Sequence, residues 1–166
     1  MVWVRSEYAG ELAVLVTWLS VLVPWNVTYA PDVADGVLSI WFPFFEVRYV
    51  VGLSPIGGLT ILDVLSELAL QSGTTVYFAY SVWTIGAFVV VVAAAVSLVY
   101  YFYEERVEAT PVDPVRALGA LHLLAGGVFA AATYLVATRG FPGYSVPVGA
   151  LLFLGFGVLL LTVERT

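Results

Sequence analysis

The sequence predicts an α-helical integral membrane protein, in which a four-transmembrane-helix bundle carries a small extracellular cap of β-strands and a short helix. Apolar residues make up 61% of the chain and charged residues only 11%, against about 25% charged residues in an ordinary soluble domain. Long apolar stretches alternate with polar segments, at about residues 9–25, 75–103, 114–138 and 146–163. No hydrophilic stretch is long enough to fold alone, so we expect residues 1–166 to form a single membrane domain.

The ends of these stretches carry signals typical of membrane helices. In the second stretch, an aromatic group around Tyr80 and another around Tyr101 are about 21 residues apart, or ~31 Å along a helix. This length matches a hydrocarbon core of ~30 Å. Asp113 followed by Pro114 is a favourable helix start, because proline lacks the donor that would be unpaired there. The fourth stretch has about 18 residues, or ~27 Å, and is just long enough to cross.

Several segments resemble a known family. The opening MVWVRSEYAGELAVL, FPFFEVRY at 42–49, EERVEATPVDPVR at 104–116 and TRGFPG at 138–143 resemble a family of uncharacterised haloarchaeal multi-pass membrane proteins. The absence of lysine and the acidic excess are also typical of halophilic archaeal proteins. The family carries no assigned activity, so the resemblance implies a location and not a function.

The arginines predict the orientation, because positive residues are commoner in cytoplasmic segments. With the N-terminus in the cytoplasm, the inner segments hold most of the arginines: Arg5, Arg106, Arg116 and Arg165. The outer segments then hold Arg48 and Arg139. We therefore expect a multi-pass protein of the cell membrane with cytoplasmic N- and C-termini.

The loop between the first two stretches, residues 26–74, has a pattern of its own. Residues 26–29, 37–42 and 44–51 read as strands. In the last of these, side chains alternate between two faces. Glu46 and Arg48 lie on one face, and the other face is apolar: Phe45, Val47, Tyr49 and Val51. We expect the apolar face to be buried and the charged residues to be a same-face pair in water. Val47→Asp should then abolish accumulation, and Glu46→Gln should be nearly silent.

A short amphipathic helix follows Gly58 in this loop. Thr60 and Asp63 imitate a capping box at its start. The spacing places Asp63 and Glu67 one turn apart on a face that we expect to be wet. Paired carboxylates can hold a cation or exchange protons when burial perturbs their pKa, but a solvated helix face is the simpler interpretation.

His122 is the only histidine and lies within the third apolar stretch. An ionisable group inside a membrane helix is a functional candidate. One imidazole cannot make a metal site, which needs three or four ligands, so a hydrogen bond to a neighbouring helix is favoured. The chain has no cysteine, which excludes disulfides and thiol chemistry. We predict no cofactor, no metal and no catalytic residue.

These observations favour a non-enzymatic membrane protein that acts as an interaction or accessory subunit through its loop. The candidate interaction surface is a group of aromatic residues expected to be exposed: Trp41, Phe42, Phe44 and Phe45. The expected partners are the lipid bilayer and another membrane or cell-surface protein, or a second copy of the chain. A net charge of −6 without a basic cluster argues against nucleic acid.

The alternative function is a small transporter or channel-like unit that acts as an oligomer. The hydroxyl groups of Thr84, Ser97 and Thr133, together with His122, would have to line its path. Mid-membrane charges and inverted repeats, which mark many transporters, are not visible in the apolar stretches.

Overall fold

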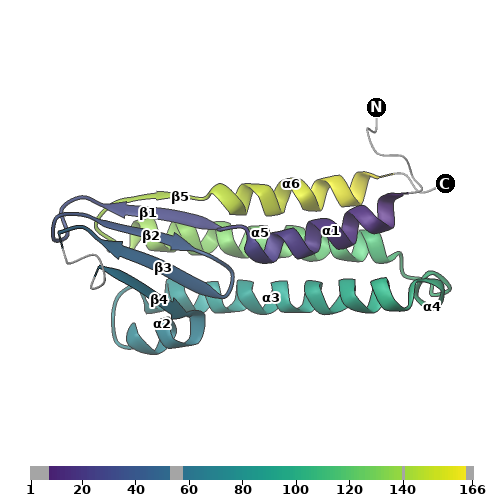
Figure 1. Cartoon of the computed structure of the whole chain (residues 1–166), viewed down its shortest axis with the longest axis horizontal. Helices are drawn as coiled ribbons and strands as arrows, with labels where there is room; N and C mark the ends of the chain where they lie inside the picture. Colours follow the sequence, from purple (N-terminus) through teal and green to yellow (C-terminus); the bar gives the residue numbers. More distant parts are fainter. Residues whose placement is uncertain (1–7, 53–57, 140, 164–166) are drawn as a thin grey trace.

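The computed structural model describes residues 8–52, 58–139 and 141–163, and these form a mixed α/β fold (Figure 1). The described residues contain six helices: α1 (Ala9–Leu22), α2 (Val64–Leu70), α3 (Tyr77–Phe102), α4 (Glu104–Glu108), α5 (Pro114–Thr138) and α6 (Val148–Thr162). They also contain five strands: β1 (Asn26–Ala30), β2 (Val37–Trp41), β3 (Phe45–Val50), β4 (Leu59–Asp63) and β5 (Tyr144–Val146).

The strands form one antiparallel sheet in the order β4-β3-β2-β1-β5. Strands β1 to β4 come from the loop after α1, whereas β5 comes from the segment between α5 and α6 and pairs with β1. The register is continuous across the sheet: Ile61 lies beside Val47, Val47 beside Ile40, Ile40 beside Val27, and Val27 beside Val146. Because side chains alternate along a strand, every such row lies on one face.

The molecule has a helical half and a sheet half. Figure 1 shows the strands running along the direction of the helices and lying over part of α5. Helix α1 continues into β1, and β5 leads into α6, whereas α3 and α5 extend along both halves. The hydrophobic core is divided accordingly, with one cluster around Trp25, Trp83 and Phe129 at the sheet and another around Leu118 and Leu160 among the helices.

Small residues bring α5 and α6 close together. A Cβ atom added at Gly126 would meet the backbone nitrogen of Leu154 at 2.9 Å, and one added at Gly119 would meet the carbonyl oxygen of Gly157 at 3.2 Å. Close backbone approach replaces bulky side-chain packing here, as it does where lipid supplies no hydrophobic drive for helices to associate. Gly127, one residue further on, faces open space.

The predicted fold class, an all-helical four-span bundle with a small cap, is wrong. Helices form within the four apolar stretches, but the loop forms most of a five-stranded sheet, which β5 completes from the other end of the chain. Among the helices of the described residues, only α3 and α5, with a mean hydropathy of 2.5 and 1.7, have the length and composition of a membrane span. Helices α1 and α6 have 14 and 15 residues, or ~21 to ~23 Å, shorter than a bilayer core.

The same length and hydropathy also occur in core helices of soluble proteins, which are mostly buried. In α3 and α5, 39% of the most apolar 18-residue window is buried within the molecule. Most of each window therefore faces outward.

Candidate functional site

The inner face of the sheet, which packs against α2 and α3, is polar. One row across the strands consists of hydroxyl residues and an arginine: Thr60, Arg48, Ser39, Thr28 and Ser145. Thr28 and Ser39 are buried, and the Thr28 hydroxyl accepts a hydrogen bond of 3.0 Å from the indole nitrogen of Trp41. Polar groups on a buried face must be hydrogen-bonded to be tolerated, so this face is built from specific contacts.

A cluster of three charged side chains lies at the centre of the inner face. The Arg48 guanidinium donates to both carboxylate oxygens of Glu46, at 2.9 and 3.0 Å, and to Oε1 of Glu67 at 3.1 Å. Glu46 and Glu67 are each only 1% exposed, and Arg48 is 29% exposed. Strand β3 supplies the first two residues and α2 the third, so this cluster joins α2 to the sheet.

The cluster contains one positive and two negative groups, so burial acts strongly on its protonation. Burial raises the pKa of the Glu46 carboxyl, and the Arg48 guanidinium and the Ser39 hydroxyl oppose only part of this effect. Burial would lower the pKa of Arg48, but the two carboxylates outweigh it and raise that pKa, which keeps the guanidinium charged. Among the described residues, Oε2 of Glu67 has no hydrogen-bond partner.

These positions overturn the expected orientation of β3 and α2. The face of β3 that carries Glu46 and Arg48 points inward, whereas Tyr49 and Val51 are exposed. Glu67 is buried instead of facing water, and Asp63 is the exposed N-cap of α2, accepting hydrogen bonds from the backbone of Leu65 and Ser66. The prediction that Glu46 and Arg48 pair on one face is confirmed.

The predicted capping box around Thr60 is also wrong. Residues 59–63 form β4, so the helix begins one turn later than expected. Leu65 and Ile61 are exposed, although both are apolar. The two carboxylates proposed as a pair, Asp63 and Glu67, therefore lie in different surroundings and do not share a site.

The aromatic residues proposed as an exposed surface are largely interior. Trp41 is 1% exposed and packs edge-on against Trp25 and Trp83, with ring centroids 5.6 and 5.1 Å apart. The Phe42 carbonyl accepts hydrogen bonds from the indole nitrogens of Trp25 and Trp83 at 3.2 and 3.1 Å, which fixes the turn between β2 and β3. The sequence pattern could not reveal this, because the partners come from the segment between α1 and β1 and from α3.

The three phenylalanines of that group are half-buried. Phe42 and Phe45 stack on each other with ring centroids 4.6 Å apart. Phe44 packs against the core, and its carbonyl oxygen accepts a hydrogen bond from the backbone N–H of Val64, the first residue of α2. Of the four residues, Phe45 lies on β3 next to the buried Glu46, so its side chain is on the opposite, outer face of the sheet. The predicted surface is thus mostly a structural corner.

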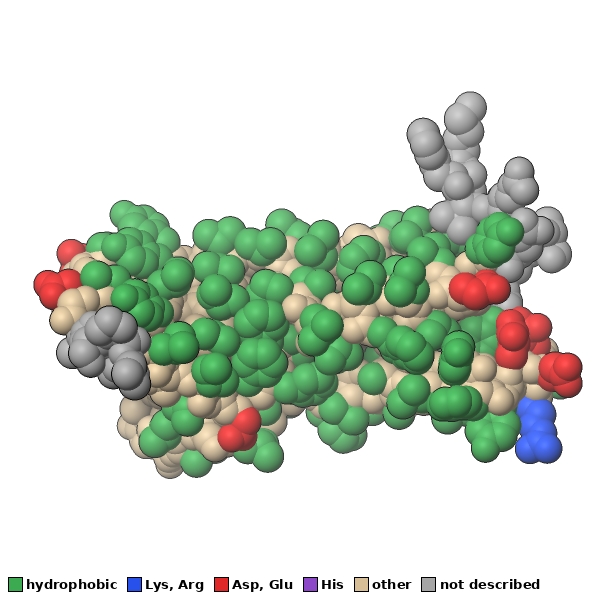
Figure 2. Space-filling model, viewed as in Figure 1, with side chains coloured by type: hydrophobic (Ala, Val, Ile, Leu, Met, Phe, Trp, Pro, Cys, Tyr) green, Lys and Arg blue, Asp and Glu red, His purple; other side chains and the backbone are tan. Residues whose placement is uncertain are grey.

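The apolar surface lies instead on the outer face of the sheet. The row nearer the helical half consists of β-branched residues: Ile61, Val47, Ile40, Val27 and Val146. The next row alternates tyrosine with leucine: Leu59, Tyr49, Leu38, Tyr29 and Tyr144. All ten are exposed or half-buried, and none is charged. Figure 2 shows hydrophobic side chains covering this face and the helices alike.

His122 lies in a separate place, between α5 and α6, and is buried. Its Nδ1 lies 2.8 Å from the carbonyl oxygen of Leu118, one turn earlier in the same helix, and its ring stacks on Phe153 with a centroid distance of 5.8 Å. A carbonyl can only accept, so Nδ1 carries the proton. A hydrogen bond to a neighbouring helix, one of the two expectations beside a position at the membrane interface, is not found: among the described residues, Nε2 has no partner.

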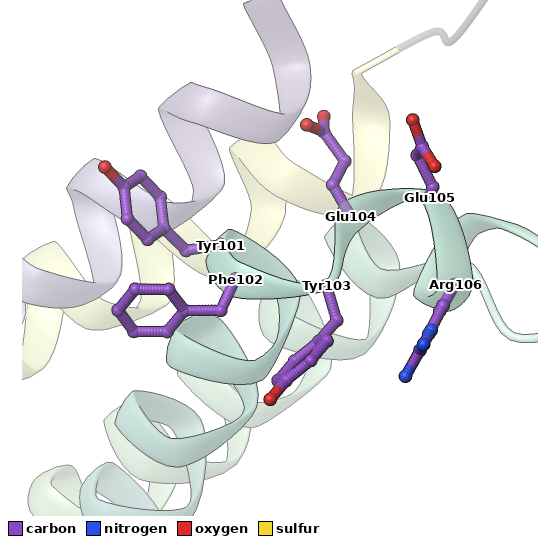
Figure 3. Close-up of a pocket in the computed structure, with 6 residues that line it drawn as sticks. All are labelled: Tyr101, Phe102, Tyr103, Glu104, Glu105 and Arg106. Carbon is purple, nitrogen blue, oxygen red and sulfur yellow. The ribbon is translucent and has the colours of Figure 1, made fainter.

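A shallow hollow of about 380 Å³ lies at the far end of the helical half, where α3 meets α4. Figure 3 shows its side chains pointing apart, with Glu104 and Glu105 on one side of the backbone and Tyr103 and Arg106 on the other. The Arg106 guanidinium lies 5.8 Å from the Tyr103 ring centroid. Side chains that diverge do not converge on a ligand, so we assign no site to this hollow.

The fold and these surfaces define a mixed α/β protein with apolar helices and an open sheet that is polar inside and apolar outside. The chain belongs to a family of unknown function, DUF7549, whose model matches residues 2–165. No curated protein matches the chain. The resemblance to an uncharacterised family is thus confirmed, while its haloarchaeal and multi-pass character stays a prediction.

Proposed function

We propose that the protein is embedded in a membrane by its helical half. Each of the four longer helices exposes large apolar side chains that water would disfavour, among them Leu22, Phe88, Tyr134 and Leu151. In Figure 2 the acidic and arginine side chains gather mainly at the two ends of the molecule. An apolar belt between two charged ends matches the profile of a bilayer.

In this arrangement α3 and α5 cross the hydrocarbon core. They have 26 and 25 residues, or ~39 and ~37 Å, which exceeds the ~30 Å core by about two turns. The excess of α3 lies at its N-terminal end, where Trp83 packs against the sheet. Helices α1 and α6 pack alongside these two, and the sheet lies outside the hydrocarbon.

The orientation remains the one that the arginines predict, with both termini in the cytoplasm and the sheet outside. Arg5 and Arg165 lie outside the described residues. Of the others, Arg106 lies in α4 and Arg116 in the first turn of α5, whereas Arg48 lies in β3 and Arg139 follows the last turn of α5. Asp32→Cys in this cysteine-free chain tests it, since position 32 lies in the β1–β2 turn. If position 32 is labelled only from inside the cell, the proposed orientation is wrong and the sheet lies in the cytoplasm.

We propose that the protein acts by binding another protein through the outer face of the sheet, without catalysing a reaction. The single observation that supports this is the pair of uncharged apolar rows on that face. Exposed apolar patches of this kind mark interaction sites. Lipid does not explain it, because an open sheet has edges whose unpaired backbone groups are not tolerated in hydrocarbon.

The experiment is an affinity purification from native membranes in mild detergent with two matched variants. Val47→Asp places a charge on the outer face, and Val33→Asp makes the same change in the exposed β1–β2 turn. An unpaired charge in an apolar contact costs several kcal/mol, so Val47→Asp should lose the bound protein while Val33→Asp keeps it. Equal retention by both variants, or recovery of the wild-type chain as a monomer with neither another protein nor a second copy bound, would contradict the proposal.

The transport alternative gains no support from the described residues. The hydroxyls of Thr84 and Thr133 donate to backbone carbonyls one turn earlier in their own helices, and Ser97 donates to Ala94 and accepts from Trp18. The hydroxyls of Thr84 and Thr133 are thus engaged within their own helices, and the hydroxyl of Ser97 links α3 to α1.

A further inference from the structure

We infer that the partner of the outer face is a second copy of this chain, packed sheet against sheet about a two-fold axis parallel to the helices. This inference rests on the proposed function, since it names what the outer face binds. It depends on three features of that face: its charge, its direction relative to the helices, and its size.

The charge of the face favours a like surface. The chain carries a net charge of −6, yet the two rows centred on Ile40 and Leu38 contain no charged residue. These two rows offer nothing to a charged partner surface and give no like-charge repulsion against a copy of themselves; the charged residue of this face, Asp63, lies in the next row, opposite Phe45. Tyrosine side chains, which pair a large apolar ring with one hydroxyl, are favoured where two protein surfaces meet. A closed dimer requires such a self-complementary patch.

The direction of the strands allows this pairing within one membrane. The strands run along the direction of the helices, so the outer face looks sideways and not along the membrane normal (Figure 1). A two-fold axis along the helices then brings two outer faces together while both copies keep the same orientation in the bilayer. Two sheets of like twist pack aligned, at about −30° and ~10 Å apart. The central strand, β2, lies opposite its own copy.

The size of the face suits an association that a membrane assists. Five strands about 4.8 Å apart and about 17 Å long make a face of roughly 400 Å², about half the ~800 Å² that each partner buries in a standard interface. Two copies confined to one membrane in one orientation lose less freedom on pairing than two free molecules do. A face of this size is therefore sufficient there.

Cross-linking of single-cysteine variants tests the pairing directly, because the natural chain has no cysteine. Ile40→Cys lies on β2 in the middle of the outer face, Val33→Cys lies in the β1–β2 turn, and Leu22→Cys lies on the exposed side of α1. A short bismaleimide is the reagent, since sheets ~10 Å apart exceed the Cα separation of a disulfide. The purified full-length protein is treated in vesicles and its mass is read on a denaturing gel.

We expect Ile40→Cys to form a dimer about tenfold faster than the other two variants, and Val47→Asp added to it to remove that advantage. Equal rates at all three positions would mean random collision and would overturn the pairing. If Ile40→Cys forms no dimer but joins a different protein in native membranes, the second copy is excluded and the proposed function stands. If Ile40→Cys in native membranes reacts freely with an impermeant maleimide and forms no product, both proposals fail.

Discussion

The helical half and the sheet half expose the same kind of surface but are held together in opposite ways. Among the helices, contact is made by close backbone approach at Gly119, Gly126 and Gly157. Under the sheet, contact is made by a buried ionic cluster and by indole hydrogen bonds. Apolar residues face outward in both halves, so exposure alone does not say what covers them. The backbone decides: a helix satisfies its own hydrogen bonds in lipid, whereas an open sheet does not.

The largest effect on stability is expected from a substitution that breaks the ionic cluster of the sheet half. Arg48→Met leaves the buried carboxylates of Glu46 and Glu67 without their positive partner, which should lower the free energy of unfolding by about 3–5 kcal/mol. Thermal unfolding in detergent measures it. Arg116→Met is the matched control, because Arg116 is exposed and lies 3.7 Å from Asp113; it should change stability by less than about 1 kcal/mol. Similar losses in both variants would refute a special role for the cluster.

The next largest effect on stability is expected where α5 contacts α6 in the helical half, and substitutions at two neighbouring glycines test it. Gly126→Ala forces a Cβ against the backbone of Leu154, and overpacking of this kind costs about 1–3 kcal/mol. Gly127→Ala meets open space and should be neutral or stabilising by up to about 1 kcal/mol, because alanine is the better helix former. The difference between their unfolding temperatures is the readout, and a reversed order would show that α5 and α6 do not cross here.

A smaller effect concerns pH and is specific to the sheet half. The folded state raises the pKa of Glu46 above its ordinary 4.5, so folding is favoured by protonation of that group. This contribution is fully present below pH 4.5 and is lost as the pH rises through the raised value. Stability should therefore increase as the pH falls from neutral through the raised pKa of Glu46, and Glu46→Gln should flatten the dependence.

The groups that face Glu46 are Arg48 and Ser39 of the sheet and Glu67 of α2. Asp63, whose pKa is lowered by its hydrogen bonds with Ser66, acts in the opposite direction but only as the pH falls below 3.8. A Glu46→Gln variant with the pH profile of the natural chain would assign the effect to another group.

The smallest effect on stability is expected at Val47, where the sequence pattern predicted the largest. Val47 is half-buried on the outer face, so Val47→Asp should change the free energy of unfolding of the single chain by less than about 1 kcal/mol. Unfolding in detergent, under conditions where the chain is monomeric, measures it. Loss of folding in this variant would show that Val47 lies inside.

Local signals in the sequence were informative where the structure is local. Asp113 caps α5 with Pro114 in its first turn, and the strand ranges around residues 26–29, 37–42 and 44–51 match β1 to β3 to within one residue or so. Alternation along β3 also separated its two faces correctly. It could not say which face is buried, because that depends on α2 and α3, whose contacts with the strand are long-range.

The candidate site shows the same division. The link between Arg48 and Glu67 joins residues 19 apart in the chain, and β5 pairs with a strand more than 100 residues away. No periodicity reports such pairings. The rule that charged residues face water assumed that water covers the other side of the sheet, and here a helix covers the charged side instead.

The accessibility of two neighbouring residues of β1 tests most directly whether the sheet is polar inside and apolar outside. Thr28 is 0% exposed and Tyr29 is 43% exposed. In detergent, under conditions where the chain is monomeric, Tyr29→Cys should react with a maleimide rapidly, whereas Thr28→Cys should react only after unfolding. If Thr28→Cys reacts as fast as Tyr29→Cys, or faster, the two faces are assigned the wrong way round and the proposed docking surface does not exist.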